Sequence, residues 1–251
     1  MKHFITIIIL TASTFITLLG HAQKIDETAV TFLVDATEKN IFDAIETDFN
    51  QNLNVFFNNA GIGKIGFGQR LTIRMGAIDE SNQLTLQSRS IALTDKKVSR
   101  KQAESLRNPR PLLELISAEL AKYKQLSEKN MALSPIIDVT LKAFREMNTE
   151  AREIIVISTD GLENSNYANF YKNIPTSEQA VEKLISKTDN ILLVEAKEAI
   201  AATDPEVVII LKPNDKVKKT AELKKFYNEF FRQLGINTIR FIDNLSNNPN
   251  L

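Results

Sequence analysis

The sequence contains no cysteine and no tryptophan, and only two histidines, His3 and His21. The absence of cysteine excludes a disulfide framework, cysteine-ligated zinc, iron–sulfur clusters and thiol catalysis. Basic and acidic residues number 31 each among 251, so no net positive charge points to a nucleic-acid partner. With 43% hydrophobic and 25% charged residues, the composition is that of a globular protein with a sizeable core.

The first 22 residues have the pattern of a secretory signal peptide. Lys2 provides a positive start, residues 4–19 form an apolar run, and Gly20 and Ala22 are the small residues that a signal peptidase reads. A membrane span needs about 20 apolar residues, so we predict cleavage after Ala22, with an uncleaved anchor as the alternative. The mature protein is then expected to be exported, periplasmic or extracellular in a bacterial envelope, with no integral membrane span.

Cleavage would also remove both histidines, because they lie within the signal segment. Histidine general-base chemistry, Ser-His-Asp triads and histidine-ligated zinc are therefore excluded in the mature chain. Carboxylate, hydroxyl and lysine chemistry remains.

Residues 23–243 predict one α/β domain, and residues 244–251 a frayed tail. Apolar runs predict strands at 28–34, 70–78, 83–93, 153–158, 207–211 and 238–242. Helical periodicity predicts helices at 38–58, 111–126, 134–147 and 177–202, a short one within 96–110, and one that Asn214 caps and Gly235 ends. Residues 191–194 fit a helix or a strand. We expect a doubly wound, mainly parallel six-stranded sheet with helices on both faces and strands 28–34 and 154–158 central and adjacent.

Residues 61–66 match the glycine spacing of a dinucleotide-binding fingerprint. That fingerprint requires a strand before it and a helix after it, whereas here a helix precedes and a strand follows. The segment is therefore predicted to be a loop.

Oxygen-bearing side chains gather at three predicted segment ends. Asp35 and Thr37 follow the first strand, Ser134 opens a helix, and Asp160 follows the strand 153–158. The carboxyl ends of neighbouring parallel strands form one crevice, and such oxygens suit Mg²⁺ or Ca²⁺. Each residue also has a local explanation: Thr37 and Ser134 as helix N-caps, Asp160 as part of a turn, and Asp35 as an acid favoured by the helix dipole.

These segments resemble the three metal-site segments of von Willebrand factor A-like domains over about residues 27–243. They are Phe32-Leu33-Val34-Asp35, Ser134-Pro135-Ile136-Ile137-Asp138, and Ile155 to Asn164 around Ser158-Thr159-Asp160-Gly161. The resemblance implies a binding domain that engages a protein partner at the carboxyl edge of the sheet. It also implies a degenerate metal-ion-dependent adhesion site formed by Asp35, Thr37, Ser134 and Asp160.

Lys39 stands where that family has a second hydroxyl. We expect its ammonium to point into the crevice, pair with Asp35 or Asp160, and leave the protein without a cofactor. In the alternative arrangement Lys39 turns toward Asp43, and the site binds Mg²⁺ weakly. The residues expected to contact the partner are Glu38, Glu163 and Asn164.

The leading hypothesis is an exported, non-enzymatic protein-binding module without a nucleic-acid partner. An envelope scaffold that has lost the metal site is one alternative, and Lys39 favours it. A carboxylate-based hydrolase is another, in which Asp35 and Asp160 would face each other across a cleft.

Overall fold

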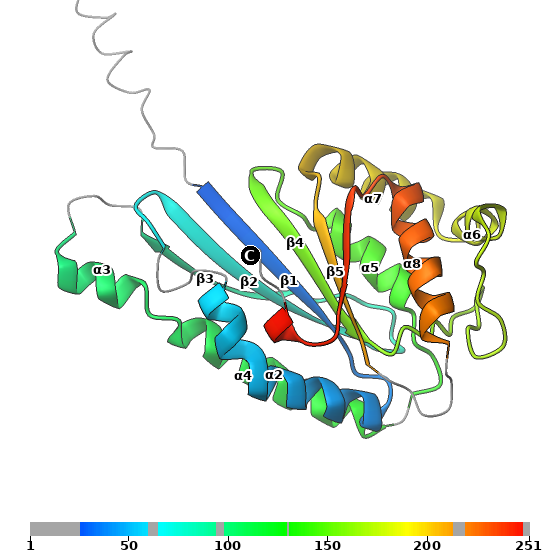
Figure 1. The fold of residues 1–251 in the computed structure, drawn as a ribbon, viewed down its shortest axis with the longest axis horizontal. Helices are drawn as coiled ribbons and strands as arrows, with labels where there is room; N and C mark the ends of the chain where they lie inside the picture. The colour runs from blue at the N-terminus through cyan, green and yellow to red at the C-terminus, as the bar shows by residue number, and fades with distance from the viewer. Residues whose placement is uncertain (1–25, 60–64, 94–97, 130, 213–218, 248–251) are drawn as a thin grey trace, which may run out of the picture.

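The computed structural model describes residues 26–59, 65–93, 98–129, 131–212 and 219–247 (Figure 1). The predicted signal peptide, most of the glycine-rich loop and the predicted cap Asn214 lie outside these residues. None of the helices in the described ranges is both long and apolar enough to cross a membrane.

A six-stranded sheet with the order β3-β2-β1-β4-β5-β6 forms the centre of the protein. Neighbouring strands are parallel, except that β3 runs antiparallel to β2. The predicted class, a doubly wound and mainly parallel sheet, is confirmed. The strands are β1 (Asp26–Asp35), β2 (Gln69–Ile78), β3 (Gln87–Leu93), β4 (Ala151–Thr159), β5 (Glu206–Leu211) and β6 (Thr238–Ile242).

The two central strands, β1 and β4, lie side by side as predicted, with Val30 opposite Ile154 and Val34 opposite Ser158. Both are nearly continuous apolar runs, and a strand of that kind is stable only where both faces of its sheet are covered. Their carboxyl ends bring Asp35 and Thr159 together at one edge of the sheet. This pairing positions the candidate site.

Helices cover both faces of the sheet (Figure 1). On one face Phe32 of β1 packs against Phe49 and Phe56, with ring centroids 5.3 Å apart in each pair. Burial of each such side chain stabilises the fold by roughly 1.5–3 kcal/mol. The helices on this face are α2 (Lys39–Asn59) and α4 (Arg110–Ser127), and those on the other are α5 (Ile136–Arg145), α7 (Asn190–Thr203) and α8 (Thr220–Leu234). The shorter helices are α3 (Arg100–Leu106), which contacts β3, and α6 (Glu178–Ile185), which contacts α8.

The structure decides one open alternative and revises two sequence predictions. Residues 191–194 are helical, within α7. Strand β3 begins at Gln87 instead of residue 83, because Leu84 and Leu86 fold over the sheet against Gly76. The expected tail is ordered at its start: Leu245 is fully buried in the 3-10 helix η2 (Leu245–Asn247), and its N–H donates to Asp48 Oδ1 at 3.1 Å.

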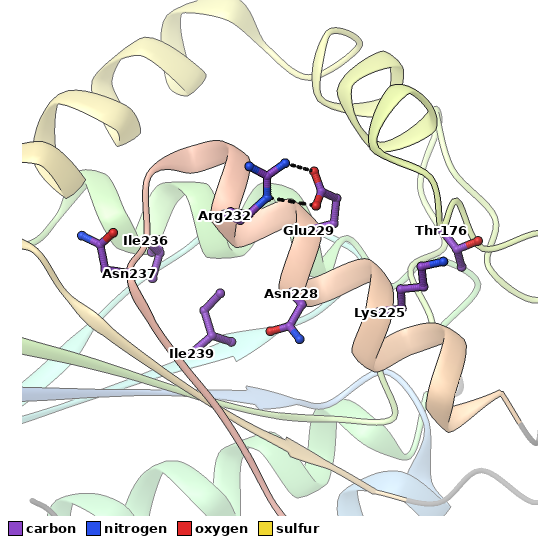
Figure 2. Close-up of a pocket in the computed structure, with 8 residues that line it drawn as sticks. All are labelled: Thr176, Lys225, Asn228, Glu229, Arg232, Ile236, Asn237 and Ile239. Atoms are coloured by element: carbon purple, nitrogen blue, oxygen red, sulfur yellow. Dashed lines mark hydrogen bonds and ion pairs between the residues drawn. The ribbon is translucent and has the colours of Figure 1, made fainter.

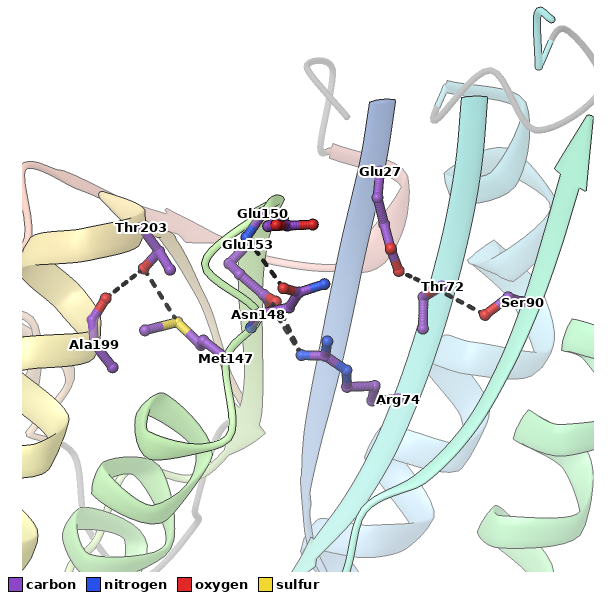
Figure 3. Close-up of polar contacts among 10 residues, drawn as sticks. All are labelled: Glu27, Thr72, Arg74, Ser90, Met147, Asn148, Glu150, Glu153, Ala199 and Thr203. Atoms are coloured by element: carbon purple, nitrogen blue, oxygen red, sulfur yellow. Dashed lines mark hydrogen bonds and ion pairs between the residues drawn. The ribbon is translucent and has the colours of Figure 1, made fainter. Parts of the chain in front are cut away.

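Toward the amino ends of the strands, polar side chains from neighbouring strands contact one another (Figure 3). Nη1 of Arg74, on β2, lies 3.1 Å from each carboxylate oxygen of Glu153, on β4. The Asn148 N–H also donates to Glu153 at 2.7 Å. On the neighbouring strands Thr72 donates its hydroxyl to Glu27 at 2.6 Å. The buried carboxylate of Glu153 therefore has both an ion pair with Arg74 and a backbone hydrogen bond from Asn148.

Candidate functional site

Asp35 ends β1 and ties the carboxyl edge of the sheet together. Its side chain is 1% exposed. Oδ1 accepts hydrogen bonds from the Thr37 N–H at 3.1 Å and the Thr37 hydroxyl at 2.6 Å, and Oδ2 accepts one from the Thr159 hydroxyl at 2.6 Å. Burial raises the pKa of Asp35 above its ordinary value, and the bonds from Thr159 and Thr37 oppose that rise. Asp35 therefore links the ends of β1 and β4.

Asp160 begins the loop that follows β4. Its Oδ1 accepts a hydrogen bond from the Leu162 N–H at 2.9 Å. Between them Gly161 adopts φ 79°, a left-handed conformation that glycine tolerates best, and its carbonyl accepts a hydrogen bond from the Tyr227 hydroxyl at 3.0 Å. The loop is thereby held close to the end of β4 by both its side chain and its backbone.

Tyr171 lies among the carboxylates of this edge. Its hydroxyl donates to Glu38 Oε1 at 3.0 Å. Burial raises the pKa of Tyr171, and the nearby charges of Asp160, Glu38 and Asp35 raise it further. The acids that follow β1 and β4 thus converge around one tyrosine.

Ser134 joins the site through its backbone. It exchanges two hydrogen bonds with Asn164, at 2.8 and 3.0 Å, which connects the segment before α5 to the loop after β4. Its hydroxyl is buried and has no hydrogen-bond partner among the residues that the structure describes. Ser134 is therefore not an N-cap; Pro135 occupies that position, without a side-chain capping bond.

Glu163 was predicted to contact a partner, and that prediction is wrong because the side chain is 0% exposed. Its Oε2 accepts a hydrogen bond from the Ile137 N–H, at the start of α5, at 2.9 Å. Burial raises the pKa of Glu163 to about 8, although the Ile137 N–H opposes the rise. The other two residues predicted to contact a partner, Glu38 and Asn164, are partly exposed.

Lys39 does not occupy the crevice. Its side chain is exposed at the start of α2, and the hydroxyls of Thr37 and Thr159 occupy the Asp35 oxygens instead. The described contacts include no ion pair of Lys39 with Asp35, Asp160 or Asp43. Pairing of Lys39 with the crevice is therefore a wrong prediction.

The oxygen atoms at this edge do not form a complete metal site. Asp35 is engaged by two hydroxyls, so the direct ligands would be Asp160, the Thr37 hydroxyl and the Ser134 hydroxyl. Octahedral Mg²⁺ takes six oxygens, and water would have to supply the rest. Within the described ranges, no three acidic or histidine side chains are grouped to hold a metal ion. Binding sites for Mg²⁺ commonly keep several waters, so the absence of a resident metal stays a prediction, and we derive no step through one.

The sequence analysis did not identify Thr159 as a partner of Asp35 or Tyr171 as a partner of Glu38. Thr159 bonds to Asp35 across 124 residues of sequence, and the parallel pairing of two buried strands was a signal that would have placed them together. Tyr171 lies in an irregular segment, where periodicity offers no signal.

No protein-family model matches the chain, and no curated protein matches it. Similar solved structures include the human COPII-coat protein Sec24c, at 12% identity over 86% of this chain and 30% of that chain, with a TM-score of 0.39. Proximal thread matrix protein 1 from the mussel byssus is 11% identical over 88% of this chain and 45% of that chain, with a TM-score of 0.33. A von Willebrand factor type A protein from Catenulispora acidiphila is 11% identical over 84% of this chain and 43% of that chain, with a TM-score of 0.27. The chain spans less than half the length of each.

Because all three TM-scores are low, the fold assignment rests on the strand order and on the pairing of β1 with β4. These two features establish a doubly wound, mainly parallel α/β fold, which is the topology that the von Willebrand A resemblance implies. The three segments that carry the resemblance meet at the carboxyl edge of its sheet.

A separate hollow of about 440 Å³ lies at α8 and β6, away from this edge (Figure 2). Basic and acidic side chains both line it, and Arg232 is already paired with Glu229 at 2.7 Å and with Glu178 at 3.1 Å. Glu229, the acid among its lining residues, is engaged by Arg232, so we do not assign the hollow a ligand.

Proposed function

We propose that the protein is an exported, non-enzymatic protein-binding module of von Willebrand A type that engages a partner at the carboxyl edge of its sheet. The observation that carries this proposal is the rigid connection of three separate segments there. Asp35 bonds to Thr159, and Ser134 pairs with Asn164. A surface whose loops are held in one arrangement loses little conformational entropy on binding.

The surface groups at this edge are held by internal bonds. Glu38 accepts a hydrogen bond from Tyr171, and Asn164 donates its amide to the Ala132 carbonyl at 2.6 Å. Both remain partly exposed. They are therefore presented in fixed positions, as recognition of a protein surface requires.

The hydrolase alternative is less well supported. A glycosidase needs two carboxyl groups that reach the substrate from opposite sides. Asp35 is buried, and both its oxygens accept hydrogen bonds within the protein. Binding is therefore better supported than catalysis. The envelope-scaffold alternative differs in needing no partner at this edge.

Capture of a partner from the envelope of the native organism tests the proposal. Glu38→Arg reverses a charge at the edge, and Glu198→Arg makes the same change at an exposed position on α7. We expect a partner that wild type and Glu198→Arg capture equally and that Glu38→Arg captures at least tenfold less. The purified partner should reproduce this difference in calorimetry. Equal capture by all three proteins would place the interface elsewhere.

Export rests on the N-terminal sequence alone. Intact-mass measurement of secreted or periplasmic material should find Gln23 at the N-terminus. Recovery of the full-length chain in the membrane fraction would contradict export.

A further inference from the structure

A cavity of about 300 Å³ opens beside the candidate site. It lies where the end of the β2–β3 hairpin, the start of α5 and the loop after β4 meet. Leu133 and Pro135, which flank Ser134 in the chain, form part of its wall. The lining residues are Glu80, Asn82, Leu133, Pro135, Asp138, Ser165, Asn166 and Tyr167.

The charge of this cavity has one sign, since its lining includes two carboxylates and neither lysine nor arginine. Asp138 is fixed in place: Oδ1 accepts a hydrogen bond from the Tyr167 hydroxyl at 2.6 Å, and Oδ2 accepts one from the Asn82 amide at 2.8 Å. Each carboxylate oxygen can accept another hydrogen bond. Glu80 is exposed at the rim.

Lys142, whose ammonium bonds to the lining residue Asn82, does not line the cavity. Its ammonium bonds to the Asn82 carbonyl, and to Asn82 Oδ1 at 3.0 Å. It lines a neighbouring hollow that shares Asn82 and Asp138 with the cavity and also includes Arg145, Asp189 and Glu195. Lys142 therefore offsets part of the Asp138 charge from outside the cavity, and none of the described basic residues lines the cavity itself.

Ser165 lines the cavity, and Ser134 and Glu163 lie close in the chain to its lining residues. The hydroxyls of Ser134 and Ser165 and Oε1 of Glu163 are buried, and none completes a hydrogen bond within the described residues. Ser134 is 6% exposed and Glu163 is 0% exposed. Ser165 faces Glu163 closely enough to lower the pKa of that carboxyl, while burial raises it. The two serine hydroxyls can each accept a hydrogen bond from a ligand rich in donors, whereas Glu163 is protonated at neutral pH and is not counted among these acceptors.

We propose that this cavity is the subsite for a basic side chain, arginine or lysine, of the protein partner. A guanidinium or ammonium group supplies several donors and no acceptor, which matches carboxylates and unsatisfied oxygens. Leu133, Pro135 and the ring of Tyr167 provide an apolar wall for the alkyl stem. This inference rests on the proposed function, and it names the chemistry of the partner without a bound metal.

The other hollows lack this pattern. The one at α8 and β6 contains Lys225 and Arg232 (Figure 2). The one on the other side of Tyr167 is lined by Lys183 and Lys187 without an acid. A basic side chain would therefore be repelled by the hollow at Lys183 and Lys187 and attracted to the cavity at Asp138.

The test titrates the purified protein with N-acetyl-arginine methylamide, N-acetyl-lysine methylamide and N-acetyl-norleucine methylamide, monitored by NMR. Norleucine keeps the alkyl stem and lacks the charge. We expect the two basic probes to shift the backbone resonances of Asn82, Ser165 and Tyr167, and norleucine to leave them unchanged. Equal shifts with norleucine, or shifts elsewhere only, would overturn the proposal.

Variants separate charge recognition from folding. Glu80→Gln and Asp138→Asn should each weaken binding of the arginine probe by about tenfold or more, because each removes a charge-assisted contact. Glu198→Gln, the matched control on α7, should not. If Asp138→Asn does not fold, the Glu80→Gln variant still tests the proposal, because Glu80 is exposed. Unchanged binding by Glu80→Gln contradicts the proposal.

Partner capture distinguishes this inference from the proposed function. If Glu38→Arg loses the partner while Glu80→Gln with Asp138→Asn keeps it, the binding edge stands and this subsite is wrong. If neither variant affects capture, the proposed function fails. We expect both variants to lose the partner.

Discussion

Replacing Glu163 by glutamine should change how the free energy of unfolding depends on pH. Glu163 is fully buried, and burial raises its pKa from 4.5 to about 8. Between these pH values the folded protein keeps a proton on Glu163 that the unfolded chain has lost. The free energy of unfolding therefore falls as pH rises, by about 1.4 kcal/mol per pH unit.

The Glu163 contribution is complete below pH 4.5 and has been lost above about pH 8. Over that interval it corresponds to about 5 kcal/mol. Glutamine does not ionise, so Glu163→Gln removes this dependence. Its amide adds a buried donor without a partner, which costs about 1–3 kcal/mol at every pH. We therefore expect Glu163→Gln to be less stable than wild type near pH 5 and more stable near pH 9.

Urea unfolding followed by circular dichroism, at constant ionic strength from pH 5 to pH 9, measures this difference. The stability of Glu163→Gln minus that of wild type should rise by about 1.4 kcal/mol per pH unit up to about pH 8. Glu198→Gln, at an exposed position on α7, should run parallel to wild type. A pH-independent difference for Glu163→Gln would refute the reasoning, since it would mean that Glu163 titrates normally.

Three further predictions concern other parts of the protein. Arg74→Ala should lower the free energy of unfolding by about 3–5 kcal/mol, measured by urea, because it leaves Glu153 buried without its ion pair. Gly161→Ala should cost about 1–3 kcal/mol or more in thermal unfolding, because φ is 79° and a Cβ would lie 2.9 Å from a Leu211 methyl group. Calorimetry with Mg²⁺, Mn²⁺ and Ca²⁺ should detect no tight binding to wild type, because both Asp35 oxygens already accept hydrogen bonds from Thr37 and Thr159.

Each has a control. Arg74→Met with Glu153→Leu should recover most of the stability lost in Arg74→Ala, and a loss below about 1 kcal/mol in Arg74→Ala would contradict the buried pair. Alanine at Gly66, which has no positive φ, should be tolerated better than at Gly161. Tight metal binding by wild type that Asp160→Ala abolishes would overturn the metal-free interpretation.

The sequence alone determined the layered architecture. Apolar runs such as 29–34 and 153–158 can be buried only in a sheet covered on both faces, and helical periodicity between the strands supplied the covering layers. Gly235 marks the end of α8 because its φ of 96° is a conformation that glycine adopts without strain. The ends of elements were less certain: β3 starts later than alternation suggests, because Leu84 and Leu86 pack over the sheet instead of pairing within it.

Only the tertiary structure decided what the acids at the carboxyl edge do. The sequence placed Asp35 and Asp160 after neighbouring strands, but not Thr159 against Asp35 or Tyr171 among the carboxylates. It presented Glu163 as a surface residue, because a charged residue in a loop is usually solvated; the structure buries it at the start of α5. Burial depends on which distant segment of the chain packs over a residue, and the local sequence pattern does not predict that packing. The cavity beside Asp138 likewise exists only because a hairpin, a helix and a loop far apart in the chain meet there.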